Sequence, residues 1–346
     1  MKKNLLVTLA DESYLDAAKQ VFSGAYFNAG WKGDYMLLAY KVPKEKLAWF
    51  RKKGILVKEC EPLVDENVFG RWFSTTLISL WLFTNEFKKW NKVIYIDGDT
   101  IIRASLDDLI KVKGFAAVSE KYSFKALFIK NLKNKSQKTY YTLKSKYNLN
   151  SLIFNAGLFV FDTDIINKDT FSDLFNLLNF YGKYILSADE PILNLFFYRK
   201  WKQLPFIYNV FVNEPVRLLY KLHFIKIEGI IIHFAGEGFF SGNKPWSKEN
   251  LFYKEWKFNF DRFELINLKK PYNNFIIFSD SEKIYWQNYY LKLYRFWLIE
   301  PIFNYYFIKP FYLIDNLIGH IGIFLKKNHP EIYYKLNKNK NENINY

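Results

Sequence analysis

The sequence predicts an α/β fold, with a mostly parallel sheet flanked by helices. Short apolar runs alternate with stretches of helical periodicity over residues 1–120, as expected for strands joined by helical crossovers. Half of the 346 residues are hydrophobic and 21% are aromatic, which is enough apolar material for a large core and too much for a disordered chain. We therefore expect one main α/β domain over residues 1–260 and a helical appendage over residues 261–346.

The first third of the chain shows this alternation most clearly. A strand is expected over residues 5–8 and a helix over residues 12–27, where apolar residues recur at helical spacing. The elements expected next are a strand over 34–40, a helix over 43–53 that begins at a proline, a strand over 55–58, a long helix over 71–87 and a helix that Ser105 caps. This order of elements is typical of a nucleotide-binding half.

A short apolar stretch, K-V-I-Y-I-D-G-D-T at residues 92–100, leads directly into the carboxylates of Asp97 and Asp99. Open α/β sheets bind ligands at the carboxyl ends of their strands, so these two side chains lie at an expected site. Two carboxylates can bind Mg²⁺ or Mn²⁺, and such an ion can neutralise a diphosphate. The alternative for D-G-D taken alone is an ordinary surface turn.

The second half of the chain continues the α/β pattern. Residues 152–162 are expected to enter a buried strand through a turn of small residues, and Gly157 indicates that another segment approaches the backbone there. The remaining elements expected are helices over 165–181 and 189–197 and strands over 206–212 and 229–233. From about residue 282 aromatic and aliphatic residues dominate, punctuated by lysine and arginine, which marks the appendage.

The net charge of +16 is concentrated in one segment, because residues 121–146 contain eight lysines and no acidic residue. This segment is either a solvated basic surface loop or a contact for an anionic partner such as acidic lipid headgroups, an acidic glycan or nucleic acid. A nucleic-acid-binding protein is disfavoured, since the lysines cluster in one loop and do not interleave with a stacking platform.

Cysteine usage and hydropathy limit the compartment. The single cysteine, Cys60, excludes an internal disulfide framework, fits a reducing compartment and is expected to be a small core residue. The basic N-terminus is too short for a signal peptide because Asp11 and Glu12 interrupt it. No uncharged run reaches the roughly 18 residues of a membrane-spanning helix, so we expect no such helix.

Six motifs occur in order between residues 4 and 246: V-T-L-A-D-E-S-Y, I-Y-I-D-G-D, F-N-A-G-L-F-V-F, D-E-P-I-L-N, H-F-A-G and K-P-W. Together they resemble glycosyltransferase family 8, the retaining nucleotide-sugar transferases that include glycogenin and bacterial lipopolysaccharide galactosyl- and glucosyltransferases. The resemblance implies a GT-A fold, a single Rossmann-like α/β domain, and the use of Mn²⁺ or Mg²⁺ with a UDP-sugar donor.

The resemblance also implies roles for individual residues. Asp97, Asp99 and His233 would bind the metal ion, and two carboxylates with one imidazole would favour Mn²⁺ over Ca²⁺. Without the H-F-A-G context His233 would be an ordinary core histidine. Lys244, with Gly236 in the segment before it, would meet the diphosphate and stabilise the departing UDP. The histidine and the lysine are further apart in this chain than in the resembling proteins, because residues 237–242 are largely inserted between them. This inserted segment could form a lid over the donor.

The nucleotide would lie at the first loop. The resemblance assigns Asp11 to a hydrogen bond with uracil, Tyr14 to stacking on the base and Leu9 to a backbone contact. Arg71 resembles the basic residue on the helix before the metal-binding strand. The alternative is that Asp11 is only a helix N-cap and Tyr14 only a surface residue.

The D-E-P-I-L-N motif departs from the family at one position, because the family usually has Asp-Gln where this chain has Asp189 and Glu190. Asp189 would orient the hydroxyls of the sugar. Glu190 would lie opposite the leaving group, where it either acts as a nucleophile or stabilises oxocarbenium charge. Asn155 and Asn194 would contact the sugar or position loops, with purely structural hydrogen bonding as the alternative.

The sequence thus predicts a metal-dependent hexosyltransferase that moves galactose or glucose from UDP to a glycan or glycolipid acceptor, such as a lipopolysaccharide or capsule precursor. The appendage over residues 282–334 would be a peripheral membrane anchor, which places the protein in the cytoplasm on the inner face of the cell membrane. The alternatives for the appendage are extra core helices or a dimer interface. The alternative functions are an inactive nucleotide-sugar-binding or membrane scaffold protein and, last, a nucleic-acid-binding protein.

Overall fold

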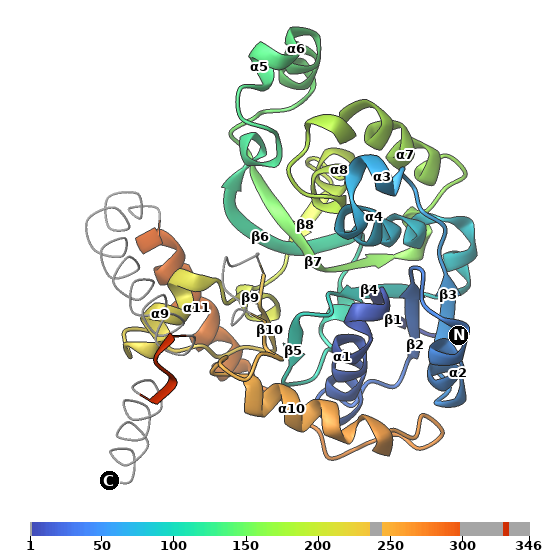
Figure 1. The fold of residues 1–346 in the computed structure, drawn as a ribbon, viewed down its shortest axis with the longest axis vertical. Coiled ribbons are helices and arrows are strands. Elements are labelled where there is room, and N and C mark those ends of the chain that lie inside the picture. The colour runs from blue at the N-terminus through green and yellow to red at the C-terminus, as the bar shows by residue number, and fades with distance from the viewer. Residues whose placement is uncertain (1, 236–243, 298–327, 332–346) are drawn as a thin grey trace. The chain divides into compact units, whose positions relative to one another are not determined.

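The computed structural model describes residues 2–235, 244–297 and 328–331. In this part of the chain, a seven-stranded sheet has the order β3-β2-β1-β4-β7-β6-β8 (Figure 1). Its strands are β1 (Leu5–Ala10), β2 (Asp34–Ala39), β3 (Leu56–Glu59), β4 (Lys92–Ile96), β6 (Phe115–Ser123), β7 (Leu152–Asp162) and β8 (Trp201–Gln203). Strand β7 runs antiparallel to its neighbours β4 and β6, and the other pairs are parallel. The predicted mostly parallel sheet is confirmed.

A second, three-stranded sheet lies where the metal site was predicted. Strand β10 (Ile231–His233) pairs antiparallel with β5 (Thr100–Ile102) and parallel with β9 (Val210–Phe211). The register places His233 opposite Thr100, the residue that follows Asp99. Long-range strand pairing therefore brings a histidine from late in the chain to the D-G-D turn.

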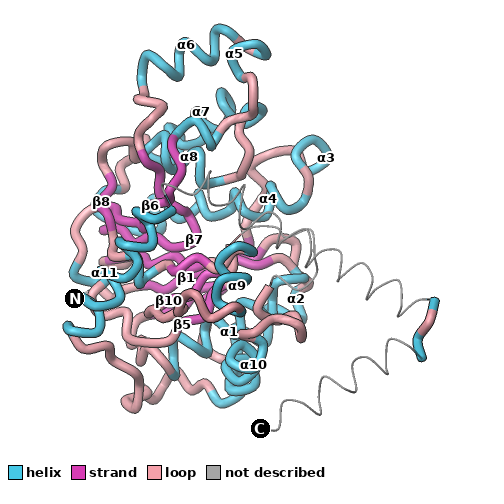
Figure 2. Tube along the Cα trace, turned by 90° about the vertical axis from the view of Figure 1, so that its left-hand side faces the viewer, coloured by secondary structure: helices cyan, strands magenta, loops and turns pink. Residues whose placement is uncertain are grey.

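The two faces of the main sheet carry different helices because side chains of a strand alternate between its faces. On β1, Leu5, Val7 and Leu9 enter one core, while Leu6 and Ala10 enter the other. The first core includes residues of α4 (Arg71–Leu77), α7 (Thr170–Tyr181) and α8 (Asp189–Phe196), and the second those of α1 (Leu15–Phe27) and α2 (Lys44–Lys52). Helix α10 (Tyr253–Asp261) lies alongside α1, as both views show (Figures 1 and 2).

Several predicted elements are shorter than expected. The long helix over 71–87 is wrong, because α4 ends at Leu77 and two 3₁₀ segments, Ile78–Phe83 and Asn85–Lys89, follow. The hydroxyl of Thr84 donates to the Trp81 carbonyl at 2.8 Å, which gives the backbone an alternative to an α-helix. The helix expected over 165–181 begins only at Thr170.

Three further predictions need correction. Ser105 caps a turn and not an α-helix: its Oγ accepts the Asp107 N–H at 3.2 Å, and only a 3₁₀ turn, Leu109–Lys111, follows. The strand expected over 206–212 is reduced to β9, because Pro205 precedes a 3₁₀ turn and the Phe206 N–H bonds the Gln287 side chain at 2.6 Å. Residues 152–162 form one continuous strand with no turn at the start.

The lysine-rich segment is partly helical and not simply a loop. Helices α5 (Leu132–Lys135) and α6 (Gln137–Lys146) follow β6 and project away from the sheet (Figure 1). Ser136 separates them, and its Oγ accepts the Thr139 N–H at 3.3 Å as an N-cap of α6. These two helices expose five lysines, Lys133, Lys135, Lys138, Lys144 and Lys146, and the segment before them exposes Lys125 and Lys130.

The predicted appendage begins with α11 (Asp280–Trp297), while α3 (Glu66–Phe69) and α9 (Glu214–Lys221) complete the described helices. The chain divides into two compact units, Met1–Leu291 and Lys292–Tyr346. The domain boundary proposed at residue 260 stays a prediction. Among the described residues, no helix combines the length and the apolar character needed to cross a membrane. Gly236 and most of residues 298–346 lie outside the described residues.

Candidate active site

The D-G-D turn is held rigidly between β4 and β5. The Asp97 N–H donates to the Gly157 carbonyl at 2.8 Å, and the Thr100 hydroxyl donates to the Asp97 carbonyl at 2.8 Å. The Tyr95 hydroxyl donates to Asp97 Oδ1 at 2.6 Å, because residues two apart on a strand share a face. These bonds fix both the backbone and one carboxylate of the predicted metal pair.

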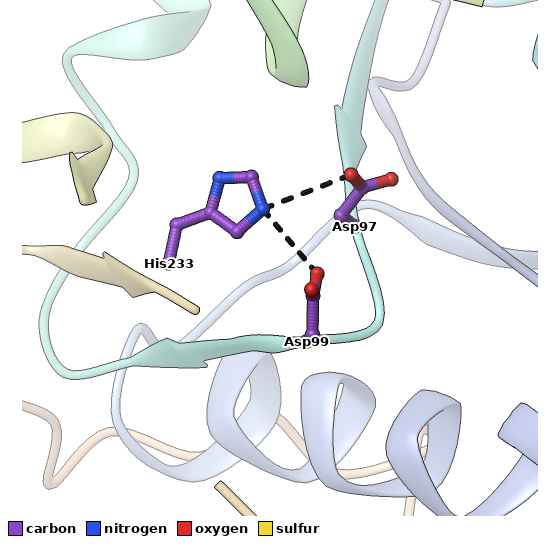
Figure 3. A group of neighbouring side chains, drawn as sticks. All are labelled: Asp97, Asp99 and His233. Carbon is purple, nitrogen blue, oxygen red and sulfur yellow. Dashed lines mark ion pairs between the residues drawn. The ribbon is translucent and has the colours of Figure 1, made fainter. Parts of the chain in front are cut away.

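His233 completes a cluster of three potential metal ligands (Figure 3). Its Nε2 lies 3.3 Å from Asp99 Oδ1 and 3.8 Å from Asp97 Oδ2. The three ligand atoms lie within 4.8 Å of one another. Two carboxylate oxygens and one imidazole nitrogen converging on one point suit Mn²⁺ or Mg²⁺, so the residues present fit a divalent ion. The predicted convergence of these three residues is what the structure shows.

Gly157 makes room for the histidine ring. A Cβ built on Gly157 would lie 2.1 Å from Cε1 and 2.8 Å from Nδ1 of His233. Contacts this short cannot be accommodated without moving the ring. The close approach predicted at Gly157 is therefore the packing of the imidazole against the β7 backbone.

Lys244 reaches the same cluster despite the long segment that precedes it. Its Nζ lies 2.5 Å from Asp99 Oδ2 and donates to the Phe234 carbonyl at 3.2 Å. Burial alone would raise the pKa of Asp99, but Lys244 and His233 hold it well below its usual range. Burial and the Asp99 charge instead raise the pKa of Asp97 to about 6. The two carboxylates therefore differ strongly although one residue separates them.

Asp189 and Glu190 form the first turn of α8. Asp189 Oδ2 accepts a hydrogen bond from the Ser79 hydroxyl at 2.6 Å. Burial and the charge of Asp97 raise the pKa of Asp189 to about 7. Glu190 Oε2 accepts from Asn155 Nδ2 at 2.9 Å and from the Ala156 N–H at 3.3 Å. Burial and the neighbouring Glu120 carboxyl raise the pKa of Glu190 well above its ordinary value.

Three residues of this site were not found from the sequence. Glu120, in the second half of β6, accepts from Asn155 Nδ2 at 2.8 Å, so one amide bridges two carboxyl groups. Asn209, before β9, bonds both Asn155 and His233. Trp246 packs edge-on against Tyr14 with ring centroids 5.3 Å apart. Trp246 had a signal in the K-P-W motif, whereas Glu120 and Asn209 stand in stretches without a distinguishing pattern.

The predicted nucleotide loop lies next to the metal cluster. Asp11 caps a 3₁₀ turn by accepting the Ser13 N–H at 2.9 Å, and its other oxygen accepts from Arg71 Nε at 2.9 Å. The structure thus brings Arg71 to Asp11. Tyr14 lies over Gly98 of the D-G-D turn, since a Cβ there would be 3.4 Å from Tyr14 Cδ1. Burial raises the pKa of Tyr14 to about 12.

Asn194 and Leu9 have structural surroundings. Asn194 uses its amide on backbone groups, accepting the Phe154 N–H at 3.0 Å and donating to the Phe154 carbonyl at 2.8 Å. This matches the structural alternative for Asn194. Leu9 is a buried residue of β1 paired with Leu38, and its carbonyl faces the Gly98 side of the turn. Gly236 lies outside the described residues.

The fold and the site define an α/β protein with a mostly parallel sheet and a cluster of three potential metal ligands at the strand ends. A sequence model of "Glycosyl transferase family 8" matches residues 6–250, and the chain belongs to that family. Galactinol synthase 7 of Arabidopsis thaliana is 25% identical over 59% of this chain and 62% of its own length. The chain therefore spans less than two thirds of that relative.

Solved structures share the fold. The bifunctional glycosyltransferase WbbM matches with a TM-score of 0.55 and 22% identity, over 75% of this chain and 50% of its own. The galactosyltransferase LgtC, solved with donor and acceptor sugar analogues, matches with a TM-score of 0.52 and 16% identity, over 80% of this chain and 98% of its own. These matches confirm the GT-A fold predicted from the motifs.

Proposed function

We propose that this protein is a retaining glycosyltransferase that moves galactose or glucose from a UDP-sugar to a glycan or glycolipid acceptor, such as a lipopolysaccharide or capsule precursor. The observation that carries the proposal is the convergence of Asp97, Asp99 and His233 at the carboxyl end of β4. Family membership supports the reaction class. The donor and acceptor sugars are the finer part of the proposal.

The donor nucleotide would bind between the first loop and the metal cluster. Asp11, at the end of β1, would accept a hydrogen bond from the uracil ring while Arg71 keeps its carboxylate in place at 2.9 Å. Tyr14 offers a ring for the base, and Trp246 supports that ring from the side. The Leu9 backbone would complete the contact.

The diphosphate would lie between the metal cluster and Lys244. Asp97, Asp99 and His233 would hold Mn²⁺ or Mg²⁺, which supplies charge neutralisation for the diphosphate when bound. Lys244, now paired with Asp99 at 2.5 Å, would exchange part of this contact for a phosphate oxygen. Cleavage of the sugar–phosphate bond builds negative charge on UDP, and a preorganised ammonium group stabilises that charge.

Glu190 could support either of two mechanisms that retain the configuration of the anomeric carbon. As a nucleophile, a carboxylate oxygen of Glu190 would bond to the anomeric carbon while the bond to UDP breaks with its electron pair on the β-phosphate. The acceptor oxygen would then bond to the anomeric carbon as the bond to Glu190 breaks with its electron pair on the carboxylate, and the hydroxyl proton would pass to a phosphate oxygen of the bound UDP. As a stabiliser, Glu190 would only lie beside the developing positive charge during front-face attack. Burial raises the pKa of Glu190, and both roles use its carboxylate form.

Replacing Glu190 with glutamine separates these routes, because it restores the residue usual in the family and cannot form the ester. Steady-state sugar transfer and mass spectrometry of the trapped enzyme would be measured for wild type and Glu190→Gln. A covalent glycosyl adduct only in wild type, with a large loss of turnover in the variant, supports the nucleophile. Near-normal turnover in the variant removes it.

The test of the function itself is UDP release with Mn²⁺ across several sugar donors. Asp97→Ala and Asp99→Ala should abolish release, while Asp107→Ala, which changes an exposed acid on the turn after β5, should keep it. If Asp97→Ala and Asp99→Ala release UDP as the wild type does, the proposed metal site is contradicted. Silence of the wild type with every donor and with added glycan acceptors would contradict the enzyme and favour a binding or scaffold protein.

We also propose peripheral contact with an anionic membrane on its cytoplasmic face. Helix α11 exposes Ile284, Tyr285 and Leu291, and residues 125–146, which include α5 and α6, expose seven lysines that pair with no acid among the described residues. Apolar and aromatic groups insert at the bilayer interface and lysines attract anionic headgroups. Flotation with anionic vesicles, with and without residues 282–346, tests this. Unchanged vesicle binding after truncation would contradict the anchor role. Binding to single-stranded nucleic acid that is tighter than binding to vesicles would indicate that the lysines contact nucleic acid and not a membrane.

A further inference from the structure

Asn209 joins the metal cluster of Asp97, Asp99 and His233 to an acidic cluster formed by Glu120, Asp189 and Glu190. It is 1% exposed and lies between the 3₁₀ turn Phe206–Tyr208 and β9. Its Oδ1 lies 2.9 Å from His233 Nδ1, and its Nδ2 donates to Asn155 Oδ1 at 3.0 Å. Since His233 Nε2 is the nitrogen that faces Asp97 and Asp99, Asn209 contacts the ring from behind the site.

One backbone N–H fixes the donor and acceptor of each hydrogen bond that links Asn155, Asn209 and His233. The Gly157 N–H can only donate, and it points at Asn155 Oδ1 at 2.8 Å, so that atom must be the amide oxygen. The amide nitrogen of Asn155 then faces Glu120 and Glu190, at 2.8 and 2.9 Å, where an acceptor is required. The same Asn155 oxygen can only accept from Asn209, which fixes the orientation of the Asn209 amide as well.

The orientation of Asn209 decides the state of the histidine. Because Asn209 presents its oxygen to His233, Nδ1 of the ring must carry the hydrogen in that bond. The neutral ring then has its lone pair on Nε2, which is directed at the space between the two aspartates. A metal-binding histidine usually has such a partner on its other nitrogen, and the loss of the partner weakens metal binding.

We infer that Asn209 is a positioning residue that holds His233 in the Nδ1–H form for metal binding through its oxygen, and anchors Asn155 between Glu120 and Glu190 through its nitrogen. This inference rests on the metal site of the proposed function. The amide oxygen of Asn209 therefore acts on the metal cluster, and its amide nitrogen acts on the acidic cluster. A substitution that keeps only the oxygen should separate these tasks.

Two variants make that separation. Asn209→Asp keeps an oxygen for His233 and loses the amino donor to Asn155, whereas Asn209→Leu has a similar volume and loses both. Asn259→Leu is the matched control, because Asn259 is also 1% exposed but bonds Asn28 and Arg262 near α10. Circular dichroism and thermal unfolding identify any variant that does not fold.

Binding of Mn²⁺ alone would be followed by the electron paramagnetic resonance signal of the free ion. Asn209→Leu should weaken binding by about 10- to 100-fold, the range found when the partner of a metal-binding histidine is removed. Asn209→Asp and Asn259→Leu should stay within about threefold of wild type, on the same scale of second-partner effects. Wild-type affinity in Asn209→Leu, or equal losses in Asn209→Asp and Asn209→Leu, would overturn the inference.

A second readout needs neither metal nor donor. The chain has four histidines, so ¹⁵N-labelled imidazole spectra of the metal-free protein at alkaline pH can assign the hydrogen of His233 with His233→Gln as reference. We expect the Nδ1–H form in wild type and its loss in Asn209→Leu. An Nε2–H form in wild type would overturn the inference. If no donor sugar is ever turned over but these spectra and Mn²⁺ binding behave as expected, the proposed reaction fails and the positioning role stands.

Discussion

The metal cluster and the acidic cluster both contain buried carboxyl groups, but they are balanced differently. Asp99 has an ammonium group at 2.5 Å and an imidazole at 3.3 Å, which lower its pKa. Asp189 and Glu190 accept bonds from a hydroxyl, a side-chain amide and a backbone N–H, and burial raises the pKa of both. In the metal cluster the pKa of Asp99 is therefore lowered while that of Asp97 is raised to about 6, whereas in the acidic cluster burial raises the pKa of both Asp189 and Glu190.

This difference indicates what each cluster is built to receive. Ionised carboxylates beside an imidazole are suited to a divalent ion. Neutral or proton-sharing carboxyl groups are suited to sugar hydroxyls, because a protonated carboxyl both donates and accepts hydrogen bonds. Burial without a cation costs stability, and functional sites are where such costs are expected.

The largest expected effect on activity comes from removing the charge of Asp99 in the metal cluster. Asp99→Asn removes the partner of both Lys244 and His233, so sugar transfer should fall by about 10²- to 10³-fold, as when one preorganised electrostatic group is deleted. Asp107→Asn, on the exposed surface of the following turn, is the control. Equal activities of the two variants in a UDP-release assay would break the comparison.

Asp189→Asn tests the acidic cluster through the pH dependence of the free energy of unfolding. The folded chain keeps the Asp189 proton up to a pKa of about 7, whereas the ordinary value is 3.8, so wild-type stability falls as pH rises between these values. Asparagine has no proton to lose, and the variant should gain at most about 4 kcal/mol over wild type at and above pH 7.

Urea unfolding of wild type and Asp189→Asn at pH 4 and at pH 8 measures this gain. The difference in unfolding free energy should be small at the lower pH and large at the higher one. A constant difference at both pH values, or a less stable variant at the higher pH, would show that Asp189 is not strained by its burial.

Gly157→Ala tests the packing between the clusters. The added methyl would lie 2.1 Å from the His233 ring, so the ring must move and the overpacked site should lose about 1–3 kcal/mol of stability. Mn²⁺ binding should weaken with it. Gly182→Ala, whose added methyl would meet Leu178 at an ordinary 3.4 Å, is the control. An alanine at 157 that leaves both stability and Mn²⁺ affinity unchanged would contradict the role of Gly157.

The smallest effect is expected at Ser79. Ser79→Ala removes the hydroxyl that bonds Asp189 at 2.6 Å, which should cost about 1 kcal/mol and raise the Asp189 pKa further. Ser74→Ala, also a buried serine of the preceding helix, is a control that leaves Asp189 untouched. The pH dependence of unfolding would separate them, and identical pH profiles for both variants would contradict the Ser79–Asp189 contact.

Local pattern was sufficient where a side chain and its neighbours in sequence decide the outcome. The apolar run of β4 ending in Asp97 and Asp99, and the first turn of α8 with Asp189 and Glu190, lie where the motifs predicted them. The helix over 71–87 was wrong because its apolar periodicity cannot distinguish a continuous α-helix from 3₁₀ segments buried on several sides. Hydroxyl bonds to the backbone decide that difference.

The sequence by itself determined the α/β alternation, the six motifs and the residue types of the metal cluster, because each depends on spacing within a few residues. Only the tertiary structure decided that His233 faces Asp99, that Gly157 must lack a side chain beneath the ring, and that Asn209 and Glu120 belong to the site. These contacts join residues far apart in the chain through strand pairing and buried hydrogen bonds. No local pattern encodes such pairings, since they arise only when β4, β7 and β10 come together.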